Sequence, residues 1–549
     1  MIRKGSQLLL IATLLVLSSA GYADAASSKG GTVDESANTV HVLVVGSFNG
    51  CTALDPAITP ATQAVLDLIR PSAFLTSSNG SLSGAGGAIS SAELVSLSPE
   101  TIQYSTAPGE KWSDGTAFNA AALVSWWNRA KNLANTLSYG YRDIASMTLS
   151  KSNQTVTAVL KTPFADWNQL FRDVESPRAS SDCSLSSLVS RPSIGPYKVV
   201  NASASTVTLS AVKSWPYDTA RFGKVVLSTS ALAPTRNAEV VAYSNVVNRA
   251  TVGAFSSNPN VSTHIGTSSA IEMLMFSEKG YLSHDLRTRD ALSVSINRSA
   301  IINQLWGAVT FAPQPASSAL YSQGQQNYPG PNSGSGLSST TTSQPSGSPS
   351  PQADCVSCAV ALLKADGYVK SASGWFRNGS RLAMTLMSGP TDLDHALANY
   401  IVSQWARIEI PTTIQFASSD ELAAQATTSG AASASIFSRP TGPSPSITAR
   451  SWCGPSWVDS YSSGIRTPAM STLCQQALSN FNPVNAAATW ASLDSLILSN
   501  FYCRPLVTAP SLLISSADLS NVVGSSSLVG FIDEIPTWSQ QVIQSQLSH

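Results

Sequence analysis

The first half of the chain shows mainly the two-residue alternation that is typical of β-strands. Ile102 and Tyr104 alternate with polar residues, and 155–160 does the same after a polar turn at 151–154. Such alternation indicates half-buried strands. An apolar run at 41–45 predicts a first strand that opens into a loop. This half therefore combines many strands with few helices.

The second half is dominated by helical periodicity. Leu397, Ile401 and Trp405 are four residues apart, which places them on one face of a helix. The same reasoning predicts helices at 286–296, 299–306, 358–364, 394–408 and 484–500. Gly367 is expected to end one helix in a left-handed cap, and Asn378-Gly379 predicts a hairpin turn.

The segment Trp112-Ser113-Asp114-Gly115-Thr116 lies between the strand that contains Tyr104 and an Ala-rich helix. Gly115 tolerates the positive φ that a tight turn requires. Asn119 is suited to cap the following helix, whose apolar face includes Trp126 and Trp127. We expect these tryptophans to pack in the core and the turn to be part of the scaffold.

Three segments have compositions that do not predict packed structure. Residues 1–25 combine a basic start, a short apolar run and an Ala23-Asp24-Ala25 cleavage motif, which predicts a signal peptide. Residues 26–40 are polar and are expected to be flexible, and 323–352 is a Ser-, Pro- and Gly-rich surface excursion that we expect to be mobile. We therefore expect export to a periplasmic or extracellular location, and no integral membrane segment.

Composition narrows the class of protein further. A chain of 549 residues is too long for one compact core, so two or three domains are expected. The 32 basic residues balance the 32 acidic ones, and this argues against a nucleic-acid partner. We expect a monomer without a cofactor.

Seven cysteines fit an oxidising compartment, and the odd number leaves at least one thiol unpaired. Cys355 and Cys358 form a lone C-x-x-C pair, which is compatible with a redox motif, a local bridge or two buried thiols. No histidine lies at ligand spacing from a cysteine pair, so we expect no metal site.

Several segments resemble, in the correct order, the family 5 extracellular solute-binding proteins of ABC importers, also known as dipeptide- and oligopeptide-binding proteins. The segments that carry the resemblance are 100–129 with its W-S-D-G-T turn, 143–160, Pro163 to Trp167, Gly195 to Val199, Arg289 to Ile301, Ala361 to Tyr368 and the Asn378-Gly379 turn. The resemblance covers roughly 41–530. The pattern around Gln325, Tyr328 and Pro329, the segment Gly442 to Pro445, and Arg504 to Leu506 with Pro510 are most similar to an actinobacterial branch. No cysteine precedes Cys51, so a lipid anchor at a cleavage site is not supported.

The resemblance implies an α/β fold of the periplasmic-binding-protein type (class II, cluster C), in which two lobes with mixed sheets surround a hinged ligand cleft. Lobe I would comprise 41–268 and 504–549, and lobe II would comprise 269–503. Cys51 and Cys183 would then both fall in lobe I, which makes them a possible disulfide. Members that bind peptides commonly carry an Asp in a strand-loop, but the corresponding stretch here, Ile436 to Pro443, contains no acid. Arg439 in that stretch would repel an ammonium group and suit an anion or a sugar hydroxyl.

The function implied is capture of a peptide-like or other small polar solute for delivery to a membrane permease. Ligand-binding candidates are Phe48 and Asn49 after the first strand, Phe437 and Arg439 opposite them, and Trp452 in a Gly- and Pro-rich stretch. An alternative within the fold is an envelope protein that binds glycolipid or mannoside precursors.

An alternative from another class is a secreted hydrolase. The sequence shows no nucleophile elbow, zinc motif or phosphate loop, and the Asp394–His395 pair fits the solvated start of a helix better than an acid–base pair. We therefore expect a protein that is not an enzyme.

Overall fold

The computed structural model describes residues 38–540 except for gaps at 45, 56, 77–81, 85, 134–137, 214, 218–221, 230–238, 244–254, 256–257, 269, 278, 281–284, 308–312, 324–327, 330–354, 443, 454–460, 462 and 523–531. The predicted signal peptide, nearly all of the predicted flexible segment 26–40 and nearly all of the predicted excursion 323–352 lie outside the described residues.

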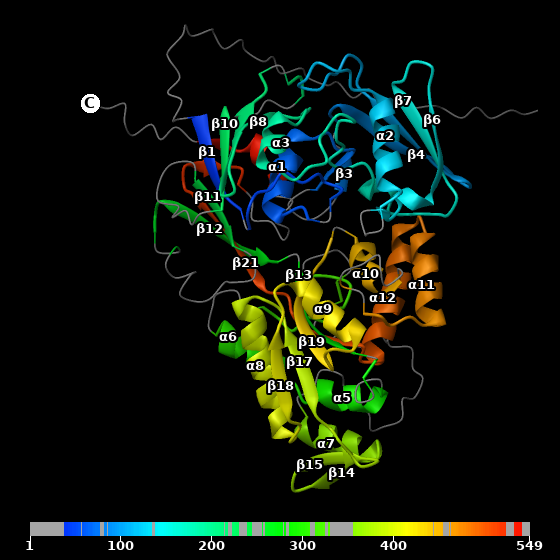
Figure 1. Ribbon diagram of the computed structural model, residues 1–549, viewed down its shortest axis with the longest axis vertical. Helices are drawn as coiled ribbons and strands as arrows, with labels where there is room; N and C mark the ends of the chain where they lie inside the picture. Colours follow the sequence, from blue (N-terminus) through cyan, green and yellow to red (C-terminus); the bar gives the residue numbers. More distant parts are fainter. Residues whose placement is uncertain are drawn as a thin grey trace, which may run out of the picture.

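A seven-stranded mixed sheet forms the upper part of the molecule (Figure 1). Its strands, in order across the sheet, are β12 (Val261–Thr267), β21 (Pro510–Ser516), β11 (Glu239–Tyr243), β1 (Thr39–Leu43), β10 (Lys224–Ser228), β9 (Thr206–Ala211) and β8 (Tyr197–Ala202). β1 pairs in parallel with both β10 and β11. Its Val40 and Val42 are fully buried, as expected for a central strand covered on its faces. The apolar run at 41–45 therefore marks a real central strand.

A four-stranded antiparallel sheet lies beside the first one and carries the W-S-D-G-T segment. Its order is β4 (Ile89–Leu97), β5 (Glu100–Thr106), β7 (Thr155–Leu160) and β6 (Ile144–Leu149). Gly115 has a φ of +80°, and the Asn119 side chain caps α2 (Ala120–Ala130) by accepting from the Ala121 N–H. Trp112 is buried against Phe118. The segment is a scaffold turn, as predicted.

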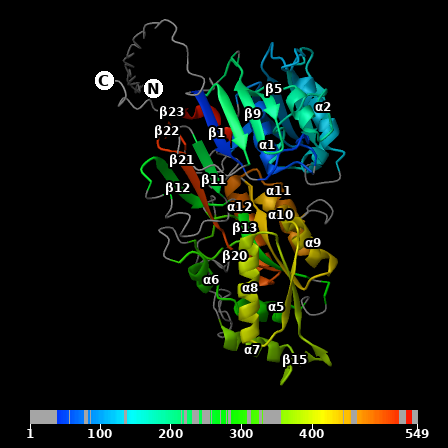
Figure 2. The same cartoon turned by 60° about the vertical axis from the view of Figure 1, so that its left-hand side comes forward.

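A five-stranded sheet forms the lower part of the molecule (Figures 1 and 2). Its order is β18 (Thr412–Phe416), β17 (Met384–Ser388), β19 (Ala434–Pro440), β13 (Ala270–Phe276) and β20 (Cys503–Val507). The side chains of β13 pack on both faces of this sheet. Leu274 and Phe276 lie in one hydrophobic core, and Met273 and Met275 lie in another. The strand is therefore buried on both sides.

The helices lie around these sheets, and the smaller strands form separate small sheets, β14-β15-β16, β2-β3 and β22-β23. The helices are α1 (Pro60–Ile69), α2, α3 (Leu185–Ser190), α5 (Leu286–Val294), α6 (Arg298–Leu305), α7 (Val356–Ala365), α8 (Asp392–Arg407), α9 (Asp420–Ser429), α10 (Pro445–Cys453), α11 (Pro468–Leu478) and α12 (Pro483–Ser499). The smaller strands are β2 (Phe74–Thr76), β3 (Leu82–Gly84), β14 (Val369–Ser371), β15 (Gly374–Arg377), β16 (Ser380–Arg381), β22 (Leu519–Ser520) and β23 (Ser539–Gln540).

The local signals for helix ends and turns are confirmed. Gly367 has a φ of +83° directly after α7. Asn378 and Gly379 both have positive φ in the hairpin between β15 and β16, as a two-residue turn of this type requires. Among the described residues, no helix is long and apolar enough to cross a membrane.

Two neighbouring chain segments join the upper and lower sheets. The chain leaves β12 at Thr267 and enters β13 at Ala270, and it returns from β20 to β21 through Thr508 and Ala509. The Ser268 N–H donates to the Ala509 carbonyl at 2.8 Å, so the two crossings are hydrogen-bonded to each other. The predicted boundary between lobe II and the C-terminal part of lobe I lies between residues 503 and 504. This position falls inside β20, which pairs with β13 of lobe II. We therefore propose that lobe II ends at Val507.

Candidate ligand-binding site

A cavity of about 290 Å³ lies between the two lobes. Most of its wall comes from lobe I, and α10 of lobe II supplies the rest. The lining residues are Ala53, Leu54, Gln63, Asp67, Trp126, Tyr139, Tyr141, Phe164, Gln169, Leu170, Arg172, Asp173, Ile447 and Arg450. A concave space that combines apolar walls with a few polar groups is the usual form of a small-molecule site.

Aromatic side chains make one wall of the cavity. The Trp126 indole N–H donates to the Tyr141 hydroxyl at 3.0 Å, and the Phe171 backbone N–H donates to the same hydroxyl at 2.7 Å. Burial raises the pKa of Tyr141 to about 12, so the phenol stays neutral. Trp126 is 2% exposed and packs in the core, as predicted, and its side chain also lines the cavity. The wall is rigid and largely apolar.

A pair of carboxyl groups lies on the same lobe. Asp67 is on α1, one helical turn after Gln63, and the Gln63 side-chain amide donates to Asp67 Oδ1 and to Asp173 Oδ2, each at 2.8 Å. Burial, followed by the charge of Asp173, raises the pKa of Asp67, and burial raises the pKa of Asp173. Arg172 instead approaches Asp533, with its Nη2 4.0 Å from Asp533 Oδ2. The Gln63 amide therefore bridges the two carboxyl groups, and the charge of Arg172 acts on both of them from a longer distance.

Lobe II contacts lobe I along the rim of the cavity through the start of α10 and the end of α11. The Ser444 hydroxyl donates to Asp166 Oδ1 at 3.0 Å, and the Ala165 N–H donates to the Leu478 carbonyl at 2.7 Å. The Arg450 guanidinium carbon lies 4.3 Å from the ring centre of Tyr139. We call these three contacts the rim contacts. They join segments that are about 280 to 310 residues apart in sequence.

The two candidates after the first strand do not line the cavity. Phe48 is 3% exposed and packs in the core of the seven-stranded sheet. The Asn49 side-chain amide donates to the Ala57 carbonyl, and its backbone N–H donates to Thr62 Oγ1 at 2.9 Å. Asn49 therefore fastens its loop to α1, and the loop places Ala53 and Leu54 in the cavity wall.

The candidates from lobe II are buried beside the site. Phe437 and Trp452 share one hydrophobic core and are at most 1% exposed. The Arg439 Nη2 atom donates to the carbonyls of Ile447 at 3.3 Å and of Thr448 at 3.1 Å. The charge of Arg439 is thus directed at the backbone of α10, and Arg439 is not among the residues that line the cavity. We assign Arg439 to the positioning of α10.

Replacing Arg439 should loosen α10. We expect Arg439→Ala to increase hydrogen exchange of the α10 amides by at least about tenfold, because two hydrogen bonds from a charged donor are lost. Hydrogen–deuterium exchange with mass spectrometry measures this. Arg287→Ala is the matched control, since exposed Arg287 donates to the Ala365 carbonyl outside the cavity lining. Unchanged protection of α10 would contradict the assigned role.

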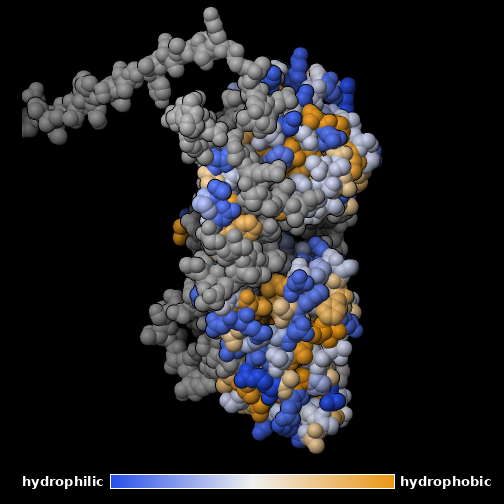
Figure 3. Space-filling view, turned by 90° about the vertical axis from the view of Figure 1, so that its left-hand side faces the viewer, coloured by the Kyte–Doolittle hydropathy of each residue, from blue (hydrophilic) through white to orange (hydrophobic). Residues whose placement is uncertain are grey.

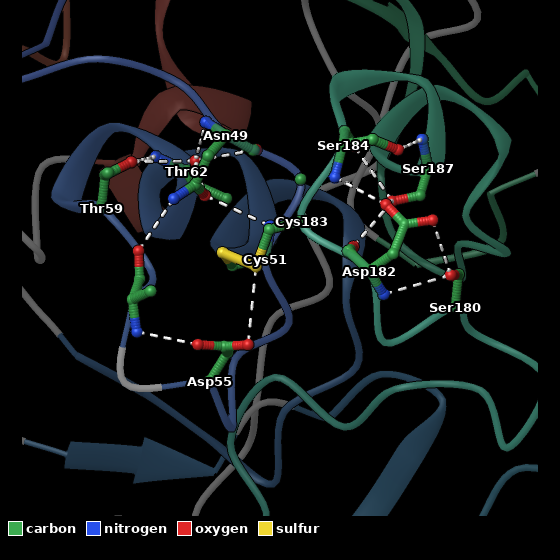
Figure 4. Close-up of a disulfide and its surroundings, with 12 residues drawn as sticks. Asn49, Cys51, Asp55, Thr59, Thr62, Ser180, Asp182, Cys183, Ser184 and Ser187 are labelled. Carbon is green, nitrogen blue, oxygen red and sulfur yellow. Dashed lines mark hydrogen bonds between the residues drawn. A yellow bond between two sulfur atoms is a disulfide. The ribbon is translucent and has the colours of Figure 1, made fainter.

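The cysteines form bridges. Cys51 bonds to Cys183, the pairing suggested from the sequence, and Figure 4 shows this bridge beside Asp55. Cys355 bonds to Cys358 and Cys453 to Cys474, while Cys503 is free and buried. Cys51, Asp55 and Cys183 are the one group within the described residues that has the spacing of a metal site. Because both sulfurs are bridged, neither can serve as a thiolate ligand.

The sequence contains a pattern from which one part of the cavity wall, helix α1, could have been predicted. Thr59 caps α1 ahead of Pro60 at its first position, and Gln63 and Asp67 are four residues apart on that helix. This pattern predicts a capped helix with two polar side chains on one face. No local sequence pattern predicts that Asp173 or Arg450 lies near that face of the helix. The tertiary fold brings these two residues to the cavity.

Comparison with known proteins matches the chain to a family. The model of the bacterial extracellular solute-binding proteins, family 5, covers residues 95–457. The oligopeptide-binding protein OppA of Mycobacterium tuberculosis (strain H37Rv) is 22% identical over 48% of this chain and 48% of its own length, and OppA of Mycobacterium bovis matches equally. The chain thus spans about half the length of these relatives.

Solved structures confirm the predicted fold class. The periplasmic EDTA-binding protein EppA has a TM-score of 0.78 at 17% identity, covering 92% of this chain and 97% of its own. NikZ from Campylobacter jejuni, in complex with Ni(L-His), has a TM-score of 0.71 at 15% identity, covering 92% and 100%. AppA from Bacillus subtilis, in complex with a nonapeptide, has a TM-score of 0.70 at 13% identity, covering 92% and 99%. At these identities the likeness concerns the fold.

Proposed function

Because the chain belongs to the bacterial extracellular solute-binding proteins of family 5, we propose that it captures a peptide-like or other small polar solute between its lobes and delivers that solute to the permease of an ABC importer. Members of this family are binding proteins and not enzymes. We propose further that the chain is exported by the signal at 1–25 and acts as a monomer without a cofactor.

The observation that carries the proposal is the cavity whose wall is shared between the lobes. Ile447 and Arg450 come from lobe II, and the remaining lining residues come from lobe I. A ligand there touches both lobes, so its binding favours the arrangement in which the lobes meet. That arrangement would be the form a permease recognises.

The fold by itself leaves the ligand open. The structures named above bind EDTA, a nickel–histidine complex and a nonapeptide, respectively. The acid expected in the strand-loop of peptide-binding members is missing from Ile436 to Pro443, of which Pro443 lies outside the described residues. The ligand must therefore be found by screening against the purified protein.

A thermal-shift screen tests the proposed function directly. A solute that binds the folded protein alone raises its melting temperature through mass action. Peptides, oligosaccharides, small amines and glycolipid headgroups should be compared, and we expect at least one soluble class to stabilise the protein. Stabilisation by glycolipid or mannoside headgroups alone would favour the envelope-assembly alternative. Stabilisation by none of these classes would contradict solute capture.

The rim contacts should matter for affinity. We expect Asp166→Ala to weaken binding of any solute found in the screen by about tenfold or more, since a hydrogen bond to a carboxylate is lost on closure. Isothermal titration calorimetry measures the change. Thr162→Ala is the control, because Thr162 is exposed and donates within lobe I to Asp143. Equal affinity of the Asp166→Ala variant and the control would exclude this role.

A further inference from the structure

The short Cys355–Cys358 bridge has no part in solute capture. The sequence is compatible with a redox motif, a local bridge or two buried thiols at this C-x-x-C pair. The structure excludes two buried thiols, because the cysteines are bonded to each other and both are half-buried. We propose that this bridge is a redox-active disulfide, which exchanges with an external dithiol. The inference does not depend on which solute the interlobe cavity binds.

The bridge lies at the start of α7, away from the interlobe cavity. Figure 1 shows α7 at the lower end of lobe II, on the side that points away from lobe I. The Cys355 backbone N–H donates to the Val294 carbonyl at the end of α5 at 2.9 Å. The buried residues of α7 are Ala359 and Leu363, so the two cysteines lie outside the hydrophobic core. A change of redox state at this position should therefore leave the core intact.

Accessibility distinguishes this bridge from the other two. Cys51 is 1% exposed and Cys474 is 4% exposed, so each of the other bridges has one buried cysteine. Of the three bridges, all formed by described residues, Cys355–Cys358 is the one in which neither cysteine is buried. Exchange requires that one sulfur is attacked and that the other leaves as a thiolate. Apolar burial disfavours such a thiolate, and the half-buried pair avoids this cost.

The start of the helix stabilises one of the two thiolates. Cys355 is the N-cap residue of α7, and its sulfur accepts the Cys358 N–H at 3.1 Å. The Ser357 hydroxyl lies 3.4 Å from the same sulfur. The first turn of α7, which is fully described, contains no acidic residue to oppose the positive end of the helix dipole. These interactions strengthen when the sulfur becomes charged, so Cys355 is the better leaving group.

The exchange proceeds in two displacement steps. A thiolate of the dithiol attacks the Cys358 sulfur and forms a mixed disulfide, and Cys355 leaves as a thiolate with the electron pair of the broken bond. The second thiolate of the dithiol then attacks the dithiol sulfur of the mixed disulfide and releases Cys358. The dithiol loses two electrons and two protons and becomes a disulfide, while both cysteines become thiols. The reverse sequence reoxidises the bridge.

Both redox states should be folded. The bridge spans 3 positions, and a loop so short restricts the unfolded chain far less than the 132 positions of the Cys51–Cys183 bridge. The N-cap hydrogen bond joins the Cys355 sulfur to a backbone N–H, so it does not require the S–S bond. Reduction and reoxidation should therefore be reversible in the native protein.

The test is equilibration of the folded protein with dithiothreitol at defined ratios of reduced to oxidised reagent. Free thiols are then alkylated with iodoacetamide and located by peptide mass spectrometry. We expect Cys355–Cys358 to be half reduced at a ratio at least about tenfold lower than either other bridge, which corresponds to about 30 mV. Circular dichroism of the same samples should stay native. The other two bridges are the internal controls.

Single variants test the order of the steps. Cys358→Ser leaves the Cys355 thiol at the start of the helix, and Cys355→Ser leaves the Cys358 thiol. At mildly acidic pH we expect iodoacetamide to alkylate Cys355 at least about tenfold faster than Cys358, because the thiolate is the reactive form. Cys503, which is free and buried, should stay unmodified in both variants and serves as the control.

Each contrary result has a distinct meaning. Reduction of all three bridges at the same ratio, or of Cys355–Cys358 last, would overturn the redox assignment. Loss of the native circular dichroism at the ratio that reduces Cys355–Cys358 would show a structural bridge and would also overturn it. Equal alkylation rates in the two single variants would refute the role of the helix start. If a single variant does not fold, the equilibration of the unaltered protein decides. Solute capture is tested separately by the thermal-shift screen.

Discussion

Glu175→Gln should lower the free energy of unfolding by about 3–5 kcal/mol, because it leaves buried arginines without their partner. The Glu175 side chain is fully buried, with Oε1 3.6 Å from Arg70 Nη2 and 3.4 Å from Arg191 Nη1. The side chains of both arginines are also fully buried. Arg129 approaches the second carboxylate oxygen at 3.4 Å. One carboxylate thus neutralises the centre of a cluster of cations.

The charges in this cluster explain the size of the expected effect. Burial lowers the pKa of Arg70 to about 10, and the charge of Glu175 acts in the opposite direction. Arg191 also donates to the carbonyls of Gly50 and Cys51, and so ties the cluster to the loop that leads to the cavity. Loss of Glu175 should therefore destabilise lobe I as a whole.

Chemical denaturation followed by circular dichroism measures this change. Glu409→Gln is the matched control, because Lys370 and Glu409 form an exposed pair at 2.6 Å. An exposed pair contributes less than about 1 kcal/mol, so the control should differ little from the unaltered protein. A loss of similar size in both variants would refute the argument from burial.

Removing the Cys51–Cys183 bridge should have a second large effect. The bridge joins residues 132 positions apart, and a loop of that length predicts about 5 kcal/mol of stabilisation through restriction of the unfolded chain. The Cys355–Cys358 bridge spans 3 positions, for which the same relation gives about 2 kcal/mol. The double variant Cys51→Ser/Cys183→Ser should therefore be destabilised by clearly more than Cys355→Ser/Cys358→Ser.

Denaturation of the two double variants in parallel provides the measurement. The short bridge is the natural control, because it removes the same number of sulfur atoms and leaves the other bridges in place. Equal losses in both variants would show that loop length does not govern the effect. The Cys51–Cys183 bridge also links the Asn49 loop to the start of α3 (Figure 4), so the longer bridge supports the cavity wall as well.

On the side shown in Figure 3, hydrophobic and hydrophilic residues of the described part of the chain are interspersed. The largest exposed apolar side chains, among them Val369 and Val484, lie on different elements.

The sequence by itself determined the elements and the family. Alternation fixed β5 and β7, four-residue spacing fixed α8, and the glycine and asparagine turns were found at Gly115, Gly367 and Asn378. These features depend on residues that are close in sequence. The backbone geometry of a strand, helix or turn determines where such residues lie relative to one another. Asp394 and His395 lie in the first turn of α8, as predicted, but the prediction that this start is solvated was wrong for Asp394, which is buried in the capping box with Thr391.

The tertiary structure alone decided the site. Asp67 and Asp173 are more than a hundred residues apart and meet through Gln63, while Arg450 reaches Tyr139 from the other lobe. Phe437 and Trp452, which were proposed as ligand-binding residues from their positions in the sequence, are buried in a hydrophobic core. Periodicity states which face of an element is buried, but not which distant element covers it. Packing between distant segments of the chain makes that choice. As a result, the buried strand-loop supports the residues beside the cavity, and the capped helix α1 forms part of the cavity wall.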